Sequence, residues 1–187
     1  MRISPKSIVK RFYVKYFSGF SLEGEEAFFE VYLDKSQYSV AGFSAGAQQA
    51  FDYVFNHTER IDTLILFSPA FFQTQNRAFV RTQLRYFRQD REAYILQFMK
   101  NVSSPLSSIH LEKYLSVGSY EELEALLVYQ WDKEKIESIL ARGIEIEIYL
   151  GSEDAIINYA DTVSFFQESG CRLHSLEDRG HLLQFKI

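Results

Sequence analysis

The stretch SVAGFSAGAQQAFDYV, residues 39–54, decides the fold because a strand-like run meets a helix-like run within it. Its first five residues are apolar and compatible with a β-strand, whereas its last eight favour a helix. Between the two runs, Gly42, Ser44 and Gly46 fit the pattern G-x-S-x-G. A tight turn needs only one glycine, so a serine between two glycines indicates a further role for the serine.

Other strand-like runs alternate with helical stretches along the chain. Strands are predicted at residues 11–17, 38–43, 62–67, 144–150 and 171–176. Helices are predicted near residues 23–33, 45–57 and 158–168. Strands that alternate with helices predict an α/β fold with about five mostly parallel strands.

The alternation is interrupted once, between the third and fourth strands. This interval is predicted to be helical throughout, with helices near residues 77–100, 111–114, 121–130 and 133–142. We expect the insertion to form a cap over the carboxyl edge of the sheet. One structural domain is predicted, with a core of residues 1–70 and 143–187 and a cap of residues 71–142.

Length, composition and charge exclude several classes of protein. A chain of 187 residues can bury a core of its own, and its net charge of −5 argues against a general nucleic-acid binder. No apolar stretch reaches transmembrane length, and Arg11 and Lys15 interrupt any signal-peptide pattern. The single cysteine, Cys171, permits no intrachain disulfide and is expected to be a buried hydrophobe. These features predict a cytoplasmic protein without a membrane segment.

A serine at a sharp strand-to-helix turn is held in a strained, exposed position suited to a nucleophile. The helix that follows brings its positive end and the N–H of Ala45 toward the serine, as half of an oxyanion hole. The plain alternative is a tight turn without chemistry.

A nucleophilic serine needs a histidine and a carboxylate, in the chain order Ser, Asp/Glu, His. Of the four histidines, His181 follows the last strand in DRGHLLQF, where the carboxyl ends of a parallel sheet meet. The glycine before it, Gly180, is expected to allow an unusual backbone angle. The other three are predicted at a helix end, in the cap and inside the last strand: His57, His110 and His174.

The carboxylate is predicted from YLGSEDAII, which places Asp154 directly after the fourth strand. Its neighbour Glu153 and the more distant Asp178 are the competing candidates. The predicted catalytic residues are therefore Ser44, Asp154 and His181. No spacing of histidines and cysteines fits a metal site, and we expect no metal or organic cofactor.

The segments GFSAG, GSEDAI and GHLL resemble those of the α/β-hydrolase superfamily, and the resemblance spans residues 11–187. YFSGF looks like the oxyanion loop of that family, with Ser18 in place of the usual histidine. By that match the N–H of Phe20 would be the second oxyanion donor. The short chain and FSGF look most like the small pimeloyl-[acyl-carrier protein] methyl ester esterases of biotin biosynthesis, of the BioV type.

The chain departs from the family in having fewer strands around the oxyanion loop. Residues 23–33 lead straight to the nucleophile strand, which leaves a reduced α/β-hydrolase fold. If the strands follow one another in space, right-handed crossovers place their helices on one face. The other face could be covered by the N-terminal segment or by a second subunit, and the oligomeric state stays open.

The resemblance implies a serine carboxylesterase that hydrolyses the methyl ester of pimeloyl-[acyl-carrier protein] to pimeloyl-[acyl-carrier protein] and methanol. The partner would be an acidic acyl carrier protein that holds methyl pimelate on phosphopantetheine. In RAFVRTQLRYFRQDR, five arginines fall within roughly 120° of a helix, either as a solvated face or as a dock for that partner. These are Arg77, Arg81, Arg85, Arg88 and Arg91.

Two other functions remain open from the sequence. One is a general carboxylesterase or thioesterase for small esters that uses no carrier protein. The other is a hydrolase scaffold that binds without catalysis. The acyl chain length and the ester preference are not determined by the sequence.

Overall fold

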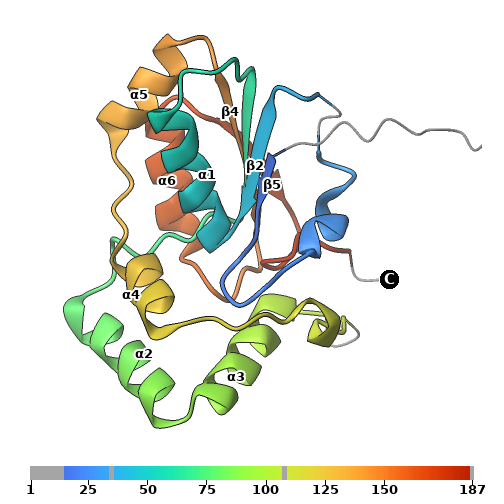
Figure 1. Ribbon diagram of the computed structural model, residues 1–187, viewed down its shortest axis with the longest axis vertical. Coiled ribbons are helices and arrows are strands. Elements are labelled where there is room, and N and C mark those ends of the chain that lie inside the picture. Colours follow the sequence, from blue (N-terminus) through green and yellow to red (C-terminus); the bar gives the residue numbers. More distant parts are fainter. Residues whose placement is uncertain (1–14, 34–35, 107–108, 186–187) are drawn as a thin grey trace, which may run out of the picture.

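The serine strand β2 (Ser39–Phe43) lies inside a parallel sheet of five strands, as the computed structural model of residues 15–33, 36–106 and 109–185 shows (Figure 1). Its spatial order is β1-β2-β3-β4-β5, which confirms the predicted five parallel strands. The other strands are β1 (Lys15–Phe17), β3 (Thr63–Phe67), β4 (Glu145–Gly151) and β5 (Arg172–Leu176). Residues 11–14 of the first predicted strand lie outside the described residues.

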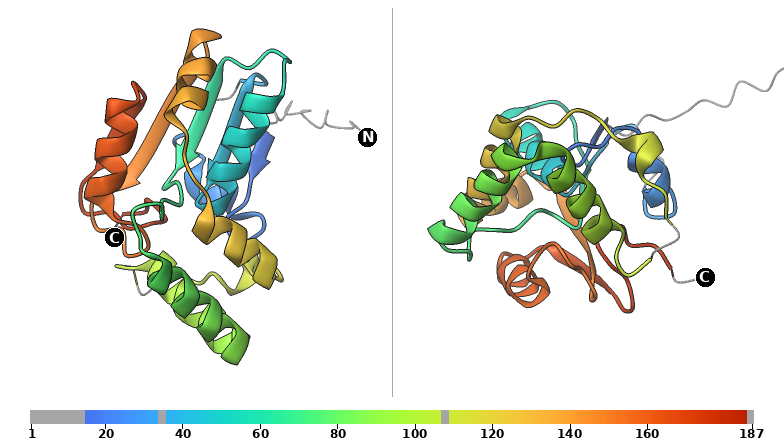
Figure 2. Two further views of the ribbon diagram at one scale, coloured as in Figure 1. Left: turned by 90° about the vertical axis from the view of Figure 1, so that its left-hand side faces the viewer. Right: turned by 90° about the horizontal axis from the view of Figure 1, so that it is seen from below.

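Three helices cover one face of the sheet, as Figure 2 shows. They are α1 (Ala45–Asn56), α5 (Lys133–Ala141) and α6 (Tyr159–Glu168). Because strands that are neighbours in the chain are also neighbours in the sheet, right-handed crossovers place their helices on the same side. The sheet residues of this face pack with Phe51, Ile136 and Phe166 in one buried cluster.

The second face is covered mainly by two short segments of the chain itself, and Met99, Val102 and Leu111 belong to the same buried cluster. One contains the 3-10 helix η1 (Glu25–Phe29), whose Phe29 ring stacks on Phe67 with centroids 4.5 Å apart. The other is the C-terminal segment, in which Leu182 and Leu183 are buried. Toward β4 and β5 this face turns polar, and Arg172 pairs there with Glu147 at 3.2 Å. The sequence did not determine what covers the second face. Over β2 and β3 the covering residues come from the same chain.

The remaining helices lie beyond the carboxyl ends of the strands (Figure 1). They are α2 (Arg77–Gln89), α3 (Arg91–Ser103), η2 (Glu112–Tyr114) and α4 (Tyr120–Val128). Within the segment predicted as a cap, α5 instead packs beside α1 on the sheet. The division of the chain into core and cap stays a prediction.

Two helix predictions are wrong. The single helix expected over residues 77–100 is broken at Asp90, which has φ −154° and accepts a hydrogen bond from the Ala93 N–H at 3.0 Å. Asp90 thus ends α2 and caps α3, as aspartate commonly does. The helix expected over residues 23–33 is only the one-turn η1, which begins after Gly24 at φ 78°.

The two glycines around Ser44 are needed for close packing. A Cβ added at Gly42 would lie 2.2 Å from the Gly46 carbonyl oxygen, and one at Gly46 would lie 2.0 Å from the Phe17 oxygen. Ser44 itself has φ 53° and ψ −113°, a conformation that L-residues rarely adopt. The start of α1 is therefore pressed against both β2 and the loop after β1.

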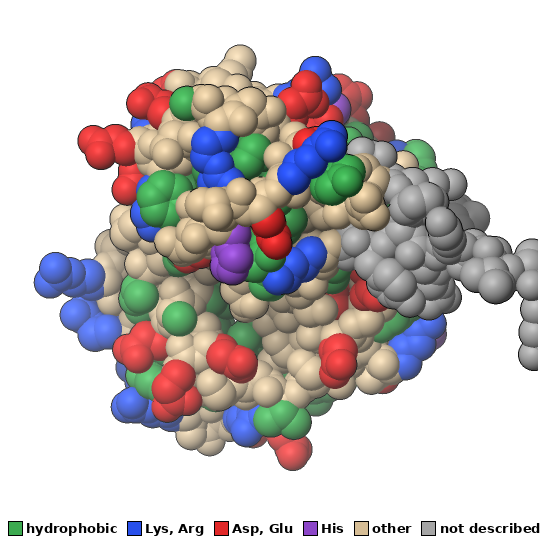
Figure 3. Space-filling view, turned by 45° about the horizontal axis from the view of Figure 1, so that its top comes forward, with side chains coloured by type: hydrophobic (Ala, Val, Ile, Leu, Met, Phe, Trp, Pro, Cys, Tyr) green, Lys and Arg blue, Asp and Glu red, His purple; other side chains and the backbone are tan. Residues whose placement is uncertain are grey.

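The molecular surface carries charges of both signs. Acidic and basic side chains are interspersed over the face shown in Figure 3, which includes the end of the sheet opposite α2 and α3. No helix in the described part of the chain is both long and apolar enough to cross a membrane.

Gly46→Ala is expected to lower the free energy of unfolding by more than about 3 kcal/mol, because its Cβ would meet fixed backbone atoms. Gly143→Ala is the matched control. Gly143 has φ 79° and open space around the added Cβ, so only backbone strain of about 1–2 kcal/mol is expected. Urea denaturation of the two variants measures the difference, and equal losses would contradict the close-packing argument.

Candidate active site

Ser44 lies at the junction of β2 and α1, and its backbone is held by neighbouring segments. Its N–H donates to the Phe67 oxygen at 2.9 Å, and its carbonyl accepts the Ala70 N–H at 3.1 Å. The side chain is 2% exposed, and its hydroxyl has no hydrogen-bond partner among the described residues. The strand–turn–helix position and the strained backbone agree with the expectation from the sequence, but the expected exposure is wrong, because Ser44 is buried.

His181 and Asp154 meet at the same edge of the sheet. Nδ1 of His181 lies 2.7 Å from Oδ2 of Asp154, and both side chains are fully buried. The second oxygen of Asp154 accepts the N–H groups of Ile156 at 2.8 Å and Ile157 at 3.2 Å. These bonds fix the carboxylate, and the carboxylate in turn fixes the imidazole ring. The competitors Glu153 and Asp178 are both exposed.

The loop that carries His181 is packed closely against the end of α3. A Cβ added at Gly180 would lie 1.7 Å from the Ser104 carbonyl oxygen, so the position has no room for a side chain. The expectation of an unusual backbone angle at Gly180 is wrong, because Gly180 does not have a positive φ. The left-handed residue of this turn is Asp178, with φ 56°. Ser68 secures the loop from β3 by donating its hydroxyl to the His181 carbonyl at 2.7 Å.

The other imidazole nitrogen of His181 is buried and unpaired within the described residues. This nitrogen and the Ser44 hydroxyl are not hydrogen-bonded to each other. The ring packs against Phe43, the residue before Ser44, with ring centroids 4.9 Å apart. Catalytic hydrogen bonds are often long in the free enzyme and tighten only with substrate bound. Two buried polar atoms without partners, the Ser44 hydroxyl and the second His181 nitrogen, thus lie at the same edge of the sheet.

The other three histidines lie away from this cluster. His57 is an exposed C-cap of α1, and His110 is exposed beside η2. His174 stacks on Tyr149 with ring centroids 4.3 Å apart, on the polar part of the second sheet face. Burial raises the pKa of the Cys171 thiol to about 12, so this thiol stays protonated and unreactive near neutral pH.

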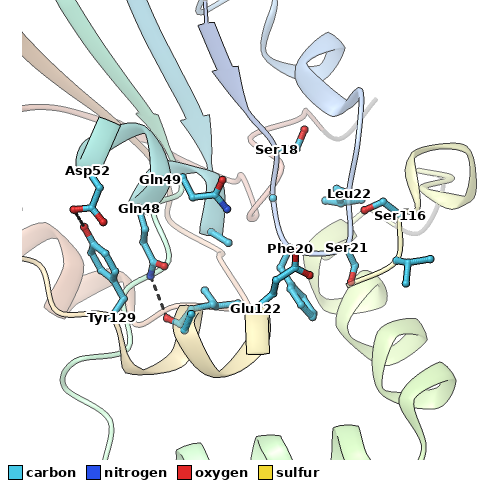
Figure 4. A pocket seen from close by; sticks show the side chains of 15 residues that line it. Ser18, Phe20, Ser21, Leu22, Gln48, Gln49, Asp52, Ser116, Glu122 and Tyr129 are labelled. Atoms are coloured by element: carbon cyan, nitrogen blue, oxygen red, sulfur yellow. Dashed lines mark hydrogen bonds between the residues drawn. The ribbon is translucent and has the colours of Figure 1, made fainter. Parts of the chain in front are cut away.

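A cavity of about 420 Å³ opens beside the turn that carries Ser44, and this volume is typical of a small-molecule site. Ala45 lines it, whereas Ser44 and His181 are not among its lining residues. Figure 4 shows its walls, which come from the loop after β1, from α1 and from residues 116–129. Both Phe20 and Ala45 line it, and no hydrogen bond among the described residues uses the Phe20 N–H. The two proposed oxyanion donors thus border the same space.

Hydrogen bonds tie α4 to the nucleophile turn across this cavity. The Gln48 amide donates to the Ala70 oxygen at 3.0 Å. It also donates to the Leu126 oxygen at 3.1 Å (Figure 4). The Trp131 indole N–H also donates to the Ala70 oxygen, at 2.9 Å. Sequence patterns did not single out Gln48, because a glutamine on a helix carries no signal of its tertiary partner.

The loop after β1 is held from its other side by a buried carboxylate. Glu25 is fully buried, and its Oε1 accepts the Gly19 N–H at 2.7 Å. The same loop closes a turn in which the Leu22 N–H donates to the Gly19 oxygen at 3.1 Å. Glu25 was missed from the sequence, since it is one of three glutamates within GFSLEGEEAFF.

The five arginines are all exposed, and none forms an ion pair within the part of the chain that the structure describes. The first four lie on α2, but Arg91 begins α3, beyond the break at Asp90. Arg88 stacks over the Tyr120 ring of α4, 4.1 Å from its centroid. Among the described residues, no group of three or more acidic, histidine or cysteine side chains is placed to hold a metal ion.

No protein-family model and no curated protein matches the sequence. Among solved structures, the chain is similar to the carboxylesterase CesB from Bacillus subtilis, with 16% identity and a TM-score of 0.54 over 85% of this chain and 57% of that one. The chain is also similar to a bromoperoxidase from Bacillus anthracis, with 14% identity and a TM-score of 0.65 over 84% of this chain and 64% of that one.

BioG from Haemophilus influenzae is also similar, with 14% identity and a TM-score of 0.58 over 90% of this chain and 88% of that one. The chain thus spans less than two thirds of the carboxylesterase and the bromoperoxidase, but most of BioG. Together with the five-stranded parallel sheet, these likenesses show a reduced α/β-hydrolase fold.

Asp154→Ala is expected to lower the free energy of unfolding by at least about 2 kcal/mol, because three buried donors lose their acceptor. Glu153→Ala changes the neighbouring exposed carboxylate and is the control, with an expected change within about 0.5 kcal/mol. Chemical denaturation measures both. A larger loss for Glu153→Ala would show that the local structure depends on the other acid.

Proposed function

We propose that the chain is a serine carboxylesterase whose catalytic residues are Ser44, His181 and Asp154. The observation that carries the proposal is the buried bond from Asp154 to His181, whose ring packs on Phe43 next to the strained Ser44 and keeps its second nitrogen without a partner among the described residues. This is the division of roles in Ser-His-Asp sites, where the carboxylate fixes the tautomer and the imidazole moves the proton. The likeness in fold to a carboxylesterase agrees with this proposal.

The proposed reaction proceeds in two halves. Nε2 of His181 takes the proton of the Ser44 hydroxyl while the serine oxygen attacks the ester carbonyl carbon. The N–H groups of Phe20 and Ala45 donate to the oxyanion, His181 protonates the leaving methoxy oxygen, and methanol departs. Water then attacks the acyl-enzyme with His181 again as base, which releases the acid and regenerates Ser44.

For the substrate, we propose the methyl ester of pimeloyl-[acyl-carrier protein]. The resemblance of GFSAG and FSGF to the small esterases of that reaction supports it, as does the extent to which the chain spans BioG. α2 carries four exposed arginines and no acidic residue, in contrast to the mixed charges seen in Figure 3. Such a face suits an acidic carrier protein.

The position of α2 also provides a route for the acyl chain. Arg88 of α2 lies on Tyr120 of α4, and Glu122 of the same helix lines the cavity. A phosphopantetheine arm that starts at the arginine face could therefore pass along α4 toward Ser44. The Phe20 ring, which touches Phe87 of α2, would lie at the inner end of that path.

One observation favours a general esterase for small free esters as the second candidate. Val117 lines the cavity and is 82% exposed, so the cavity opens to solvent without passing α2. A small ester could enter there directly. A thioester would use the same residues, and the nature of the leaving group does not distinguish the two.

Ser44→Ala should reduce kcat by at least about 10⁴-fold while the unfolding free energy stays near that of the wild-type protein, because only a hydroxyl without partners is lost. Hydrolysis of p-nitrophenyl acetate and of methyl-pimeloyl carrier protein measures the effect, with mass spectrometry to follow loss of the methyl group. Turnover near the wild-type rate would exclude this serine as the nucleophile. No turnover by the wild-type protein would favour a binding scaffold.

Replacing Arg81, Arg85 and Arg88 with glutamate should raise KM for the carrier-linked ester by about 10-fold or more, because charge reversal repels an acidic partner. Turnover of p-nitrophenyl acetate should stay within about 2-fold of wild type, since that ester needs only the catalytic residues. Added salt should slow the carrier-linked reaction selectively, because it screens the arginine face.

The control reverses Lys133 to glutamate on α5, which lies at the far end of the sheet from α2 (Figure 1). This change is expected to leave both reactions unaltered. Equal losses on both substrates in the arginine variant would indicate a displaced α2. No loss on either would make the arginines a solvated face and favour the general esterase.

A further inference from the structure

The carboxylate of Glu25 is the most deeply buried acidic group that the proposed reaction does not use. It is 0% exposed and lies at the start of η1, between the second sheet face and the loop after β1. Its Oε1 accepts the Gly19 N–H at 2.7 Å and the Tyr16 hydroxyl at 3.2 Å. Its Oε2 is buried without a hydrogen-bond partner among the described residues.

Burying a carboxyl group in this environment costs free energy of folding, which an apolar side chain that only filled the space would not cost. Burial raises the pKa of Glu25, against the lowering effect of the hydrogen bond from Gly19. A half-paired buried carboxyl group is usually less favourable than an apolar side chain of the same volume. The short bond to a backbone N–H is the contribution that an apolar side chain could not make.

That bond acts on the peptide next to the proposed oxyanion donor. Gly19 precedes Phe20, and the turn from Gly19 to Leu22 is closed by a hydrogen bond of 3.1 Å. When the Gly19 N–H is fixed, the turn can rotate little, and the direction of the Phe20 N–H is fixed with it. We propose that Glu25 is a positioning residue that aims the Phe20 N–H at the oxyanion, an inference that rests on the proposed function.

The packing on the opposite side of the loop explains why one side chain, Glu25, is sufficient to hold the loop from this side; besides its bond with Gly19, an interaction with the Ser18 side chain lowers its pKa. The start of α1 is in close contact with the loop, and a Cβ at Gly46 would lie 2.0 Å from the Phe17 oxygen and 2.5 Å from the Ser18 oxygen. α1 thus prevents the loop from moving inward, and Glu25 prevents it from rotating outward. Without an acceptor at Glu25, only the contact with α1 remains.

Three variants test the proposal with p-nitrophenyl acetate. Glu25→Met keeps the volume but removes the acceptor, and kcat is expected to fall about 10–100-fold with KM unchanged, since a misplaced oxyanion donor weakens transition-state binding alone. Glu25→Gln keeps an oxygen acceptor and should retain kcat within about 3-fold. Tyr16→Phe removes the other bond to Oε1 and should also retain kcat, because the Gly19 bond is left in place.

Two readouts separate positioning from stability. Assays well below the Tm of each variant remove the effect of unfolding, and hydrogen exchange should become faster in residues 18–22 for Glu25→Met but not for Glu25→Gln. Wild-type kcat in Glu25→Met, or equal losses in Glu25→Met and Glu25→Gln, would overturn the inference while Ser44-dependent turnover keeps the proposed function. Absence of Ser44-dependent turnover in the wild-type protein would overturn both.

Discussion

The close approach of α1 to the ends of β1 and β2 is the constraint on which the site depends. It is possible because Gly42 and Gly46 carry no side chain at a point where backbone atoms of two segments meet. The approach places Ser44 at a strained turn and brings the start of α1 beside the loop after β1. Serine, helix end and loop are therefore positioned by one packing contact.

The consecutive order of the strands has a second effect on the site. Because the helices that connect the strands lie on one face, the other face is covered by η1 and the C-terminal segment. The C-terminal segment contains His181, and its Leu182 and Leu183 are buried on that face. η1 contains Glu25, which bonds the loop after β1. The segments that complete the core are thus also the segments that carry the side chains for which we propose a role in the reaction.

Much of the fold was predictable because it follows from local pattern. The strict alternation in IEIEIYL and the turn residues of GFSAG each identify an element without knowledge of the rest of the chain. Asp154 was separable from Glu153 only by the structure, since both follow the same strand. The break at Asp90 was missed because the helical pattern continues on both sides of it. The positions of Glu25 and Gln48 were not predicted, because their hydrogen-bond partners are distant in the sequence or on other elements and leave no periodic pattern.

The backbone of Ala70 links the turn that carries Ser44 to Gln48 and Trp131. Its N–H bonds the Ser44 carbonyl, and its oxygen accepts bonds from Gln48 and Trp131, while Gln48 also bonds the last turn of α4. Moving α4 away would break the Gln48–Leu126 bond, at about 0.5–1.5 kcal/mol, and would expose the buried Leu123, Leu126 and Leu127. We therefore expect α4 to behave as a fixed wall rather than a hinged lid, and in the proposed esterase the substrate and product would exchange through the mouth of the cavity.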